Sequence, residues 1–526
     1  MIDARTETPR RGRRAAAAAF RELLRRRAPT DGEAAVPLVA AFPEGAPCPD
    51  DDGAAPVLLP LDTPLPLFAA LFDNEDARAF VSDPGCGGGV PVPARFARFV
   101  PALVELTREC GDLTADAWAR VDVRALAEAA AFFMVPRDAV ARIVELGFHR
   151  RAVAAACPAI AEAIAADSAS RMAIAAQGPR LDPWSTLRRV DGPVPWASAD
   201  VAGAPALLAE FADPAPLVGA AAAPPDALAM DPLAARVLRE FENVVVAGGA
   251  ALFSVLPRIE AGDVDYFVWG VRGTAEADAL LRGILRVFLD FDPSLAVACV
   301  SENAVTVNVN GVLHQVVLRL YDTPDQLLHG FDLAASEVLV RANHALPGAP
   351  LEAWCTAKFL AAVAHGAVWV DPGRQSLSYV MRMWKYWLKG FLILLFGLDD
   401  RGDVRGDVFT ACDVGSLPGL GLLLRMENDV RQFMHWRGYT ASDPRRVWLV
   451  ERQLRVMCRK HGLSRSDYAR PDAAPRHLPL ARILDERAAM PLAWVPSDPA
   501  RVRGSFHPVD DLFYHGAVCP VAMMNT

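Results

Sequence analysis

The feature that most constrains this chain is a pair of glycines placed between a strand pattern and a helix pattern. The apolar, β-branched run at 243–247 predicts a strand that leads directly into Gly248 and Gly249, and the run at 250–256 predicts a helix. Residues 262–269 then alternate acidic with apolar or aromatic side chains, which predicts a second strand that starts at a turn. Strand, glycine turn, helix and strand together indicate an α/β domain.

The glycines and acidic residues of this segment are suited to bind a nucleotide. Two glycines at a strand-to-helix junction let the backbone approach a triphosphate, and the helix N-terminus offers amide donors. Asp263 and Asp265 are two residues apart on a strand, so they project to the same side and can hold Mg²⁺ or Mn²⁺. We predict Asp263 and Asp265 as catalytic metal ligands, with Gly248 and Gly249 as the phosphate-binding residues of an NTP site. The alternative is a surface glycine turn followed by a solvated acidic turn.

This order of elements resembles the nucleotidyltransferase superfamily, which includes poly(A) polymerases and CCA-adding enzymes. The resemblance implies a mixed-sheet α/β (α+β) fold and a third carboxylate on a strand that follows the next helix, predicted at 274–291. The Asn-Gly pair at 310–311 predicts a hairpin after that helix, but His314 and Gln315 stand where the acid is expected. Asp332 is the fallback third metal ligand, and its alternative role is an ordinary turn residue.

A predicted helix further along carries basic and aromatic residues on one face. Tyr379, Arg382, Tyr386 and Lys389 lie at offsets of zero, three, seven and ten, and Lys385 flanks them. Such a face can grip a triphosphate or stack a base, so we predict Arg382 and Lys385 as nucleotide-binding residues. The alternative is an amphipathic helix whose cations extend past buried aromatic rings to water.

A series of short motifs follows the candidate site: Leu318-Arg319-Leu320-Tyr321, His329-Gly330-Phe331-Asp332, Ser376-Leu377-Ser378-Tyr379, Lys389-Gly390-Phe391 and Gly504-Ser505-Phe506-His507-Pro508. The series is similar to uncharacterised regions found in ankyrin-repeat and related proteins of large DNA viruses and some eukaryotes. This resemblance covers about 232–517, and no ankyrin repeat is present in the sequence. It implies a fold and a host-interaction role more than an activity.

The remaining segments differ in composition. The stretch at 121–136 runs from an acid through an alanine-rich helix pattern to an aromatic pair, and it resembles the helical hairpin of BTB-type adaptor domains. A generic small α/β domain is the alternative. The predicted organisation is a basic disordered tail at 1–35, a small α/β domain, BTB-like on this resemblance, at 36–175, a Pro-rich linker at 176–231, a nucleotidyltransferase-like domain at 232–400 and a helical C-terminal extension and tail at 401–526.

Composition limits the classes of binding partner and the cellular compartments that we expect for this chain. A net charge of −9 argues against wholesale electrostatic binding to nucleic acid. Nine cysteines without zinc-finger spacing fit reduced thiols. The most apolar run, at 391–396, is far shorter than the roughly 20 residues that a membrane span needs. We therefore expect no membrane association and a cytoplasmic or nuclear location. The resemblance to proteins of large DNA viruses implies that this location is in a host cell, or that the protein lies in a virion.

Three functional hypotheses remain open. The first is Mg-dependent transfer of a nucleotidyl group from an NTP to a hydroxyl of nucleic acid or protein, which the intact glycine turn favours. The second is a catalytically inactive nucleotidyltransferase-like protein with a structural or host-interaction role, which Gln315 favours. The third is an adaptor that recruits host ubiquitin-ligase components through residues 36–175.

Overall fold

The fold was analysed in a computed structural model. It describes residues 57–59, 65, 90–107, 112–135, 137–177, 182–190, 206–213, 228–256, 259, 262–301, 303–346, 348–371, 379–396, 419–460, 476–485, 492 and 494–496. The chain divides into two compact units, Met1–Phe148 and His149–Thr526. Three sequence features lie outside the described residues: the predicted tail at 1–35, the motif at 376–379 apart from its last residue Tyr379, and the motif at 504–508.

The first unit combines a short strand pair with helices. Strand β1 (Val57–Leu59) pairs antiparallel with β2 (Val90–Val92). Its helices are α4 (Ala94–Ala97), α5 (Val100–Thr107), α6 (Ala115–Arg120), α7 (Val123–Phe132) and the first part of α8 (Arg137–Ala156). Thr114 and Asp122 cap α6 and α7 by accepting hydrogen bonds from backbone amides of the first turn. Trp118, Leu126 and Phe133 are buried in its core, so this part is a small α/β unit.

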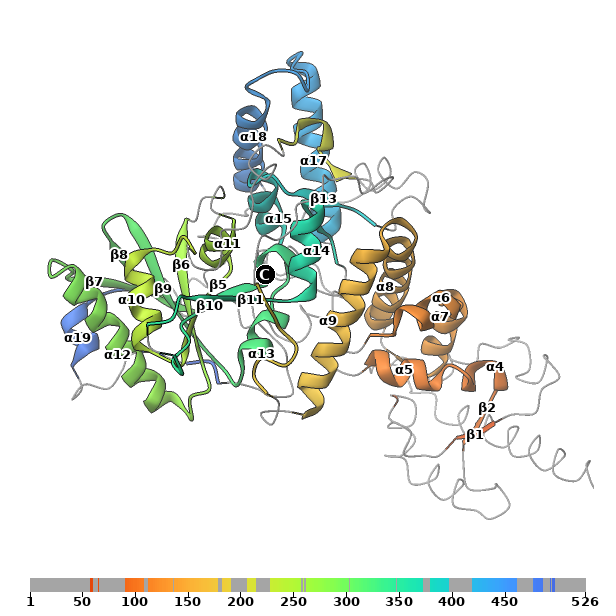
Figure 1. The fold of residues 1–526 in the computed structure, drawn as a ribbon. Helices are drawn as coiled ribbons and strands as arrows, with labels where there is room; N and C mark the ends of the chain where they lie inside the picture. Colours follow the sequence, from red (N-terminus) through yellow and green to blue (C-terminus); the bar gives the residue numbers. More distant parts are fainter. Residues whose placement is uncertain are drawn as a thin grey trace, which may run out of the picture. The chain divides into compact units, whose positions relative to one another are not determined.

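A nine-stranded mixed sheet forms the centre of the second unit (Figure 1). Its strands, in spatial order, are β14 (Arg476–Pro479), β7 (Val297–Val300), β8 (Ala304–Val309), β9 (Val312–Tyr321), β6 (Asp263–Trp269), β5 (Val244–Ala247), β10 (Val338–Arg341), β11 (Glu352–Cys355) and β3 (Arg188–Arg189). All neighbours are antiparallel except β6 and β9, which are parallel. The predicted hairpin is confirmed, since Asn310 and Gly311 have φ values of 51° and 89° between β8 and β9.

Alternate side chains of the central strands point to opposite faces of the sheet, and both faces are buried. Val246, Val264 and Tyr266 belong to the large core, which includes α10 (Pro232–Glu240) and α12 (Thr274–Phe291). On the opposite face, Val245 and Phe267 pack with residues of α13 (Pro324–His329). The helix predicted at 274–291 is confirmed, because α12 begins and ends at these residues.

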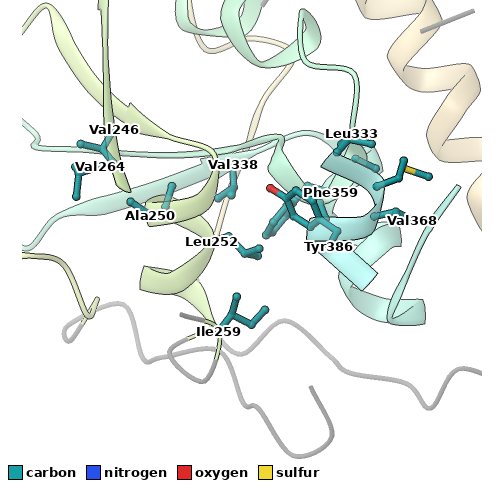
Figure 2. Packing of buried hydrophobic residues seen from close by; sticks show 14 of the residues in the cluster. Val246, Ala250, Leu252, Ile259, Val264, Leu333, Val338, Phe359, Val368 and Tyr386 are labelled. Atoms are coloured by element: carbon teal, nitrogen blue, oxygen red, sulfur yellow. The ribbon is translucent and has the colours of Figure 1, made fainter. Parts of the chain in front are cut away.

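The second unit also contains further helices, a 3₁₀ turn and a small three-stranded sheet. They are α11 (Gly249–Val255), the 3₁₀ turn η6 (Ala334–Ser336), α14 (Ala357–His365), α15 (Tyr379–Leu388), and the small sheet of β12 (Ala367–Trp369), β13 (Leu392–Leu394) and β4 (Ala206–Leu207). Figure 2 shows Leu252 of α11 directed toward Phe359 of α14 and Tyr386 of α15. This shared core brings α15 close to the glycine turn.

Segments before residue 232 also take part in the second unit. Helix α9 (Pro158–Gln177) packs on α13 and α14 and buries Ile160 and Ile164 in the second core, and the first unit ends at Phe148. Within the predicted Pro-rich linker, β3 pairs with β11 and β4 pairs with β13. The C-terminal part also joins the second unit, since β14 pairs with β7 and α19 (Leu480–Leu484) packs on α12. Within the described residues, no helix is long and apolar enough to cross a membrane.

Candidate functional site

The glycine turn lies between β5 and α11. Gly248 has a φ of +76°, a conformation that side-chain-bearing residues rarely adopt. Its amide donates a hydrogen bond to the carbonyl of Val338 on β10 at 3.1 Å, which fixes the turn against the sheet. A Cβ added at Gly248 would meet no atom of the described residues within 4 Å, although Gly248 itself is buried. Among the described residues, no side chain therefore fills the space beside its α-carbon.

The two acidic residues lie on the strand beside this turn. Asp265 pairs with Ala247, the residue immediately before Gly248, in the antiparallel β5–β6 ladder. Asp263 and Asp265 alternate with the core residue Val264, so their side chains share the opposite face of β6. Both are largely buried. The structure thus places the predicted turn and the predicted acids together at one end of β5 and β6.

A glutamine and a lysine contact Asp263. Gln315 Nε2 donates a hydrogen bond to Asp263 Oδ2 at 3.2 Å, and Lys385 Nζ lies 3.7 Å from Asp263 Oδ1. Gln315 stands beside Asp265 in the parallel pairing of β6 with β9. An amide therefore occupies the strand position where the resemblance implies a third acid, and an ammonium faces the first acid.

His314 lies on the other face of β9, inside the core. Its Nδ1 is 2.9 Å from the Tyr266 hydroxyl, and its ring packs against Phe288. Burial lowers the pKa of His314 and raises the pKa of Tyr266, so both are neutral near pH 7. His314 is consequently a core residue and does not contribute to the candidate site.

Lys389 lies near the glycine turn but was not among the residues predicted from the sequence to bind the nucleotide, although it belongs to the basic, aromatic face described above. Its ammonium lies 3.7 Å from the point that a Cβ on Gly249 would occupy. Burial, together with the neighbouring charge of Lys385, lowers the pKa of Lys389 to about 8, while Asp263 acts in the opposite direction. A signal was present in the sequence, because the chain contains only four lysines and two of them, Lys385 and Lys389, lie here.

Arg382 and Asp332 form an ion pair with each other. Arg382 Nη1 contacts Asp332 Oδ1, and Arg382 Nη2 donates to Ser336 Oγ at 3.2 Å. The Asp332 side chain is only 1% exposed. In the described part of the chain, no group of three or more His, Cys, Asp or Glu side chains could hold a metal, so Asp332 does not complete a three-acid set with Asp263 and Asp265. Asp332 is thus a partner of Arg382 in the structure, and its role as a metal ligand stays a prediction.

The site therefore combines a glycine turn with two lysines and two carboxylates. The cations suit a phosphate group, and the absence of a side chain at Gly248 and Gly249 lets such a group approach the backbone of the turn closely. Arg382, in contrast, is already neutralised by Asp332. The chain matches no protein-family model, and no curated protein sequence matches it.

Proposed function

We propose that residues 228–396 form a nucleotidyltransferase-like module that binds the phosphates of a nucleoside triphosphate and does not transfer the nucleotidyl group. The observation that carries the proposal is the position of Lys389 beside Gly249, with Lys385 next to it. Gly248 and Gly249 supply a turn without side chains, and the two ammonium groups supply the charge that a triphosphate requires.

The order and direction of the strands support the nucleotidyltransferase-like assignment. Strand β5 leads through the glycine turn into α11, and β6 returns antiparallel to β5. After α12 and the hairpin, β9 lies parallel to β6 on its other side. This is the arrangement that brings a glycine turn, an Asp-x-Asp strand and a third ligand strand to one place.

The residue types beside Asp263 favour binding without transfer. Two divalent cations need the negative charge of a third carboxylate, whereas Gln315 supplies none. Lys385 already provides a positive charge to Asp263. Because the Lys385 side chain is 46% exposed, its pairing with Asp263 is weak, and a triphosphate can take Lys385 as its own partner.

Metal-dependent nucleotidyl transfer is the second candidate, and one observation favours it. Asp263 and Asp265 project from the same face of β6 beside the glycine turn, as ligands of Mg²⁺ or Mn²⁺ would. Such an ion would be held by these two carboxylates, and it would neutralise phosphate charge and lower the pKa of an attacking hydroxyl. Metal-dependent transfer needs the negative charge of Asp263, whereas metal-free phosphate binding is expected to be stronger without that charge.

Thermal unfolding of the full chain with each common NTP tests the proposal. We expect an NTP to raise the unfolding temperature in EDTA, by an amount that corresponds to about 2.7 kcal/mol at a concentration of 100 times Kd. Asp263→Asn should strengthen this effect, because it removes a negative charge near the phosphates and releases Lys385. Lys389→Met should abolish it, whereas Lys460→Met, at a 55% exposed lysine, should not.

The opposite pattern would support transfer. Stabilisation that requires Mg²⁺ or Mn²⁺ and disappears in Asp263→Asn, together with incorporation of label from an α-labelled NTP, would establish the second candidate. No stabilisation by any NTP, with or without metal, would contradict both.

A further inference from the structure

Two helices near the C-terminal end form a hairpin that the candidate site does not use. Helix α17 (Gly419–Trp436) packs along α18 (Arg446–Lys460), and both contact α15 (Figure 1). Two tryptophans project from this hairpin into solvent: Trp436 is 75% exposed and Trp448 is 56% exposed. Large apolar side chains at such exposure mark a surface that a partner can cover.

One face of α18 combines tryptophan with arginine. Trp448, Arg452, Arg455 and Arg459 follow at offsets of zero, four, seven and eleven, and all four are exposed. At the helical rise this row is about 16 Å long. The opposite face of α18 carries the buried residues Leu449, Val450 and Leu454, so the row points away from the protein core.

Charge on the hairpin is opposite in sign to that of the whole chain. Residues 419–460 contain nine Arg or Lys and four Asp or Glu, which gives a net charge of +5, while the full chain carries −9. Guanidinium groups also lie over the exposed rings: Arg437 Cζ is 4.6 Å from the Trp436 ring centroid, and Arg452 Cζ is 5.7 Å from that of Trp448. Positive charge and aromatic surface are therefore interleaved along this hairpin.

We propose that the α17–α18 hairpin binds single-stranded nucleic acid. Successive bases stack on exposed aromatic rings, and a row of cations follows the phosphate backbone. An anionic membrane is a weaker match, because an interfacial helix needs a continuous apolar face toward the lipid, and the apolar residues of α18 are buried inside the protein. The proposal does not depend on nucleotide binding at the glycine turn.

Fluorescence anisotropy of the full chain with labelled oligo(U) and oligo(dT) of about 20 nucleotides tests the proposal, with log Kd followed against log salt. Arg452→Gln, Arg455→Gln and Arg459→Gln combined should reduce the magnitude of the salt slope by about 2, since each single-strand phosphate contact contributes about 0.7. Trp436→Ala with Trp448→Ala should weaken binding about tenfold or more and leave the slope unchanged. All five positions are exposed, so folding is expected to persist.

A matched triple variant controls for net charge. Arg236→Gln, Arg239→Gln and Arg272→Gln remove three exposed cations outside the hairpin and should leave the affinity within about twofold of the parent. Equal losses in both triple variants, or no measurable oligonucleotide binding, would overturn the proposal. Binding to phosphatidylserine vesicles without binding to either oligonucleotide would overturn it in favour of a lipid surface. NTP stabilisation, measured on the hairpin variants, reports separately on the glycine-turn site.

Discussion

At the scale of single residues, Lys389 links the candidate site to pH. Its pKa in the folded chain is about 8, below the ordinary lysine value of 10.5, so the unfolded chain binds more protons between these values. Stability from this group consequently rises as pH increases from about 8 to about 10.5, and it is lowest and constant below about 8. We expect Lys389→Met to be more stable than the parent at pH 7, with the difference shrinking toward pH 10.5.

Denaturant unfolding of both proteins across this pH range measures the difference. Lys460→Met is measured alongside as a control for the loss of a lysine at the surface, because Lys460 is 55% exposed. A constant difference for Lys389→Met would show that the ammonium is not destabilised in the folded state. A bound triphosphate should raise the pKa of Lys389, because a nearby negative charge favours the charged form.

A second lysine, Lys358, stabilises a buried ion network. Its Nζ lies 2.6 Å from Glu337 Oε1 and 3.3 Å from Asp167 Oδ2, and the Lys358 side chain is 4% exposed. Asp167 also contacts His329 at 2.6 Å. We expect Lys358→Met to cost about 3–5 kcal/mol of unfolding free energy in a denaturant titration, because it leaves buried carboxylates without their cation. Adding Glu337→Gln to Lys358→Met should recover part of that loss, and further destabilisation would contradict the account.

At the scale of elements, one glycine sets how closely α8 approaches its neighbours in the first unit. A Cβ on Gly147 would lie 2.8 Å from Trp118 Cζ3 and 2.8 Å from Val123 Cγ2, and both of those residues are 2% exposed. Gly147→Ala gains about 1 kcal/mol of helix propensity but overpacks a core contact at a cost of about 1–3 kcal/mol. We expect a lower unfolding temperature for the first unit, and Gly147→Ala combined with Val123→Ala should partly restore it.

Elements with a strong local sequence pattern could be predicted, and elements defined by distant contacts could not. Strand β5, helix α12 and the β8–β9 hairpin each have a strong local pattern, and tertiary packing agrees with it. Strands β3 and β4 contain two residues each and lie among prolines, so no periodicity could reveal them. Their pairing with β11 and β13 is determined by distant segments, and a local window contains no information about those contacts.

At the scale of the whole molecule, some contacts of the candidate site could be predicted from the sequence and others could not. The pairing of Ala247 with Asp265 could be anticipated, because the turn, the helix and the acids follow one another within about 20 residues. The approach of Lys389 to Gly249 and the pairing of Arg382 with Asp332 join residues far apart in sequence. Arg382 and Lys385 were predicted to bind the nucleotide, whereas packing pairs Arg382 with a buried acid and places Lys389, just after α15, beside the turn.

The edges of the nine-stranded sheet have a consequence for synthesis. One edge strand is β3, at 188–189, and the opposite edge strand is β14, which pairs with β7 through Arg476–Pro479. A chain that grows from its N-terminus displays the backbone groups of β7 for the time needed to add about 180 further residues, about 9–36 s at 5–20 residues per second. An unpaired strand edge is a template for pairing with other chains. The nascent protein is therefore most vulnerable to association with its own copies during that interval, before β14 has been translated.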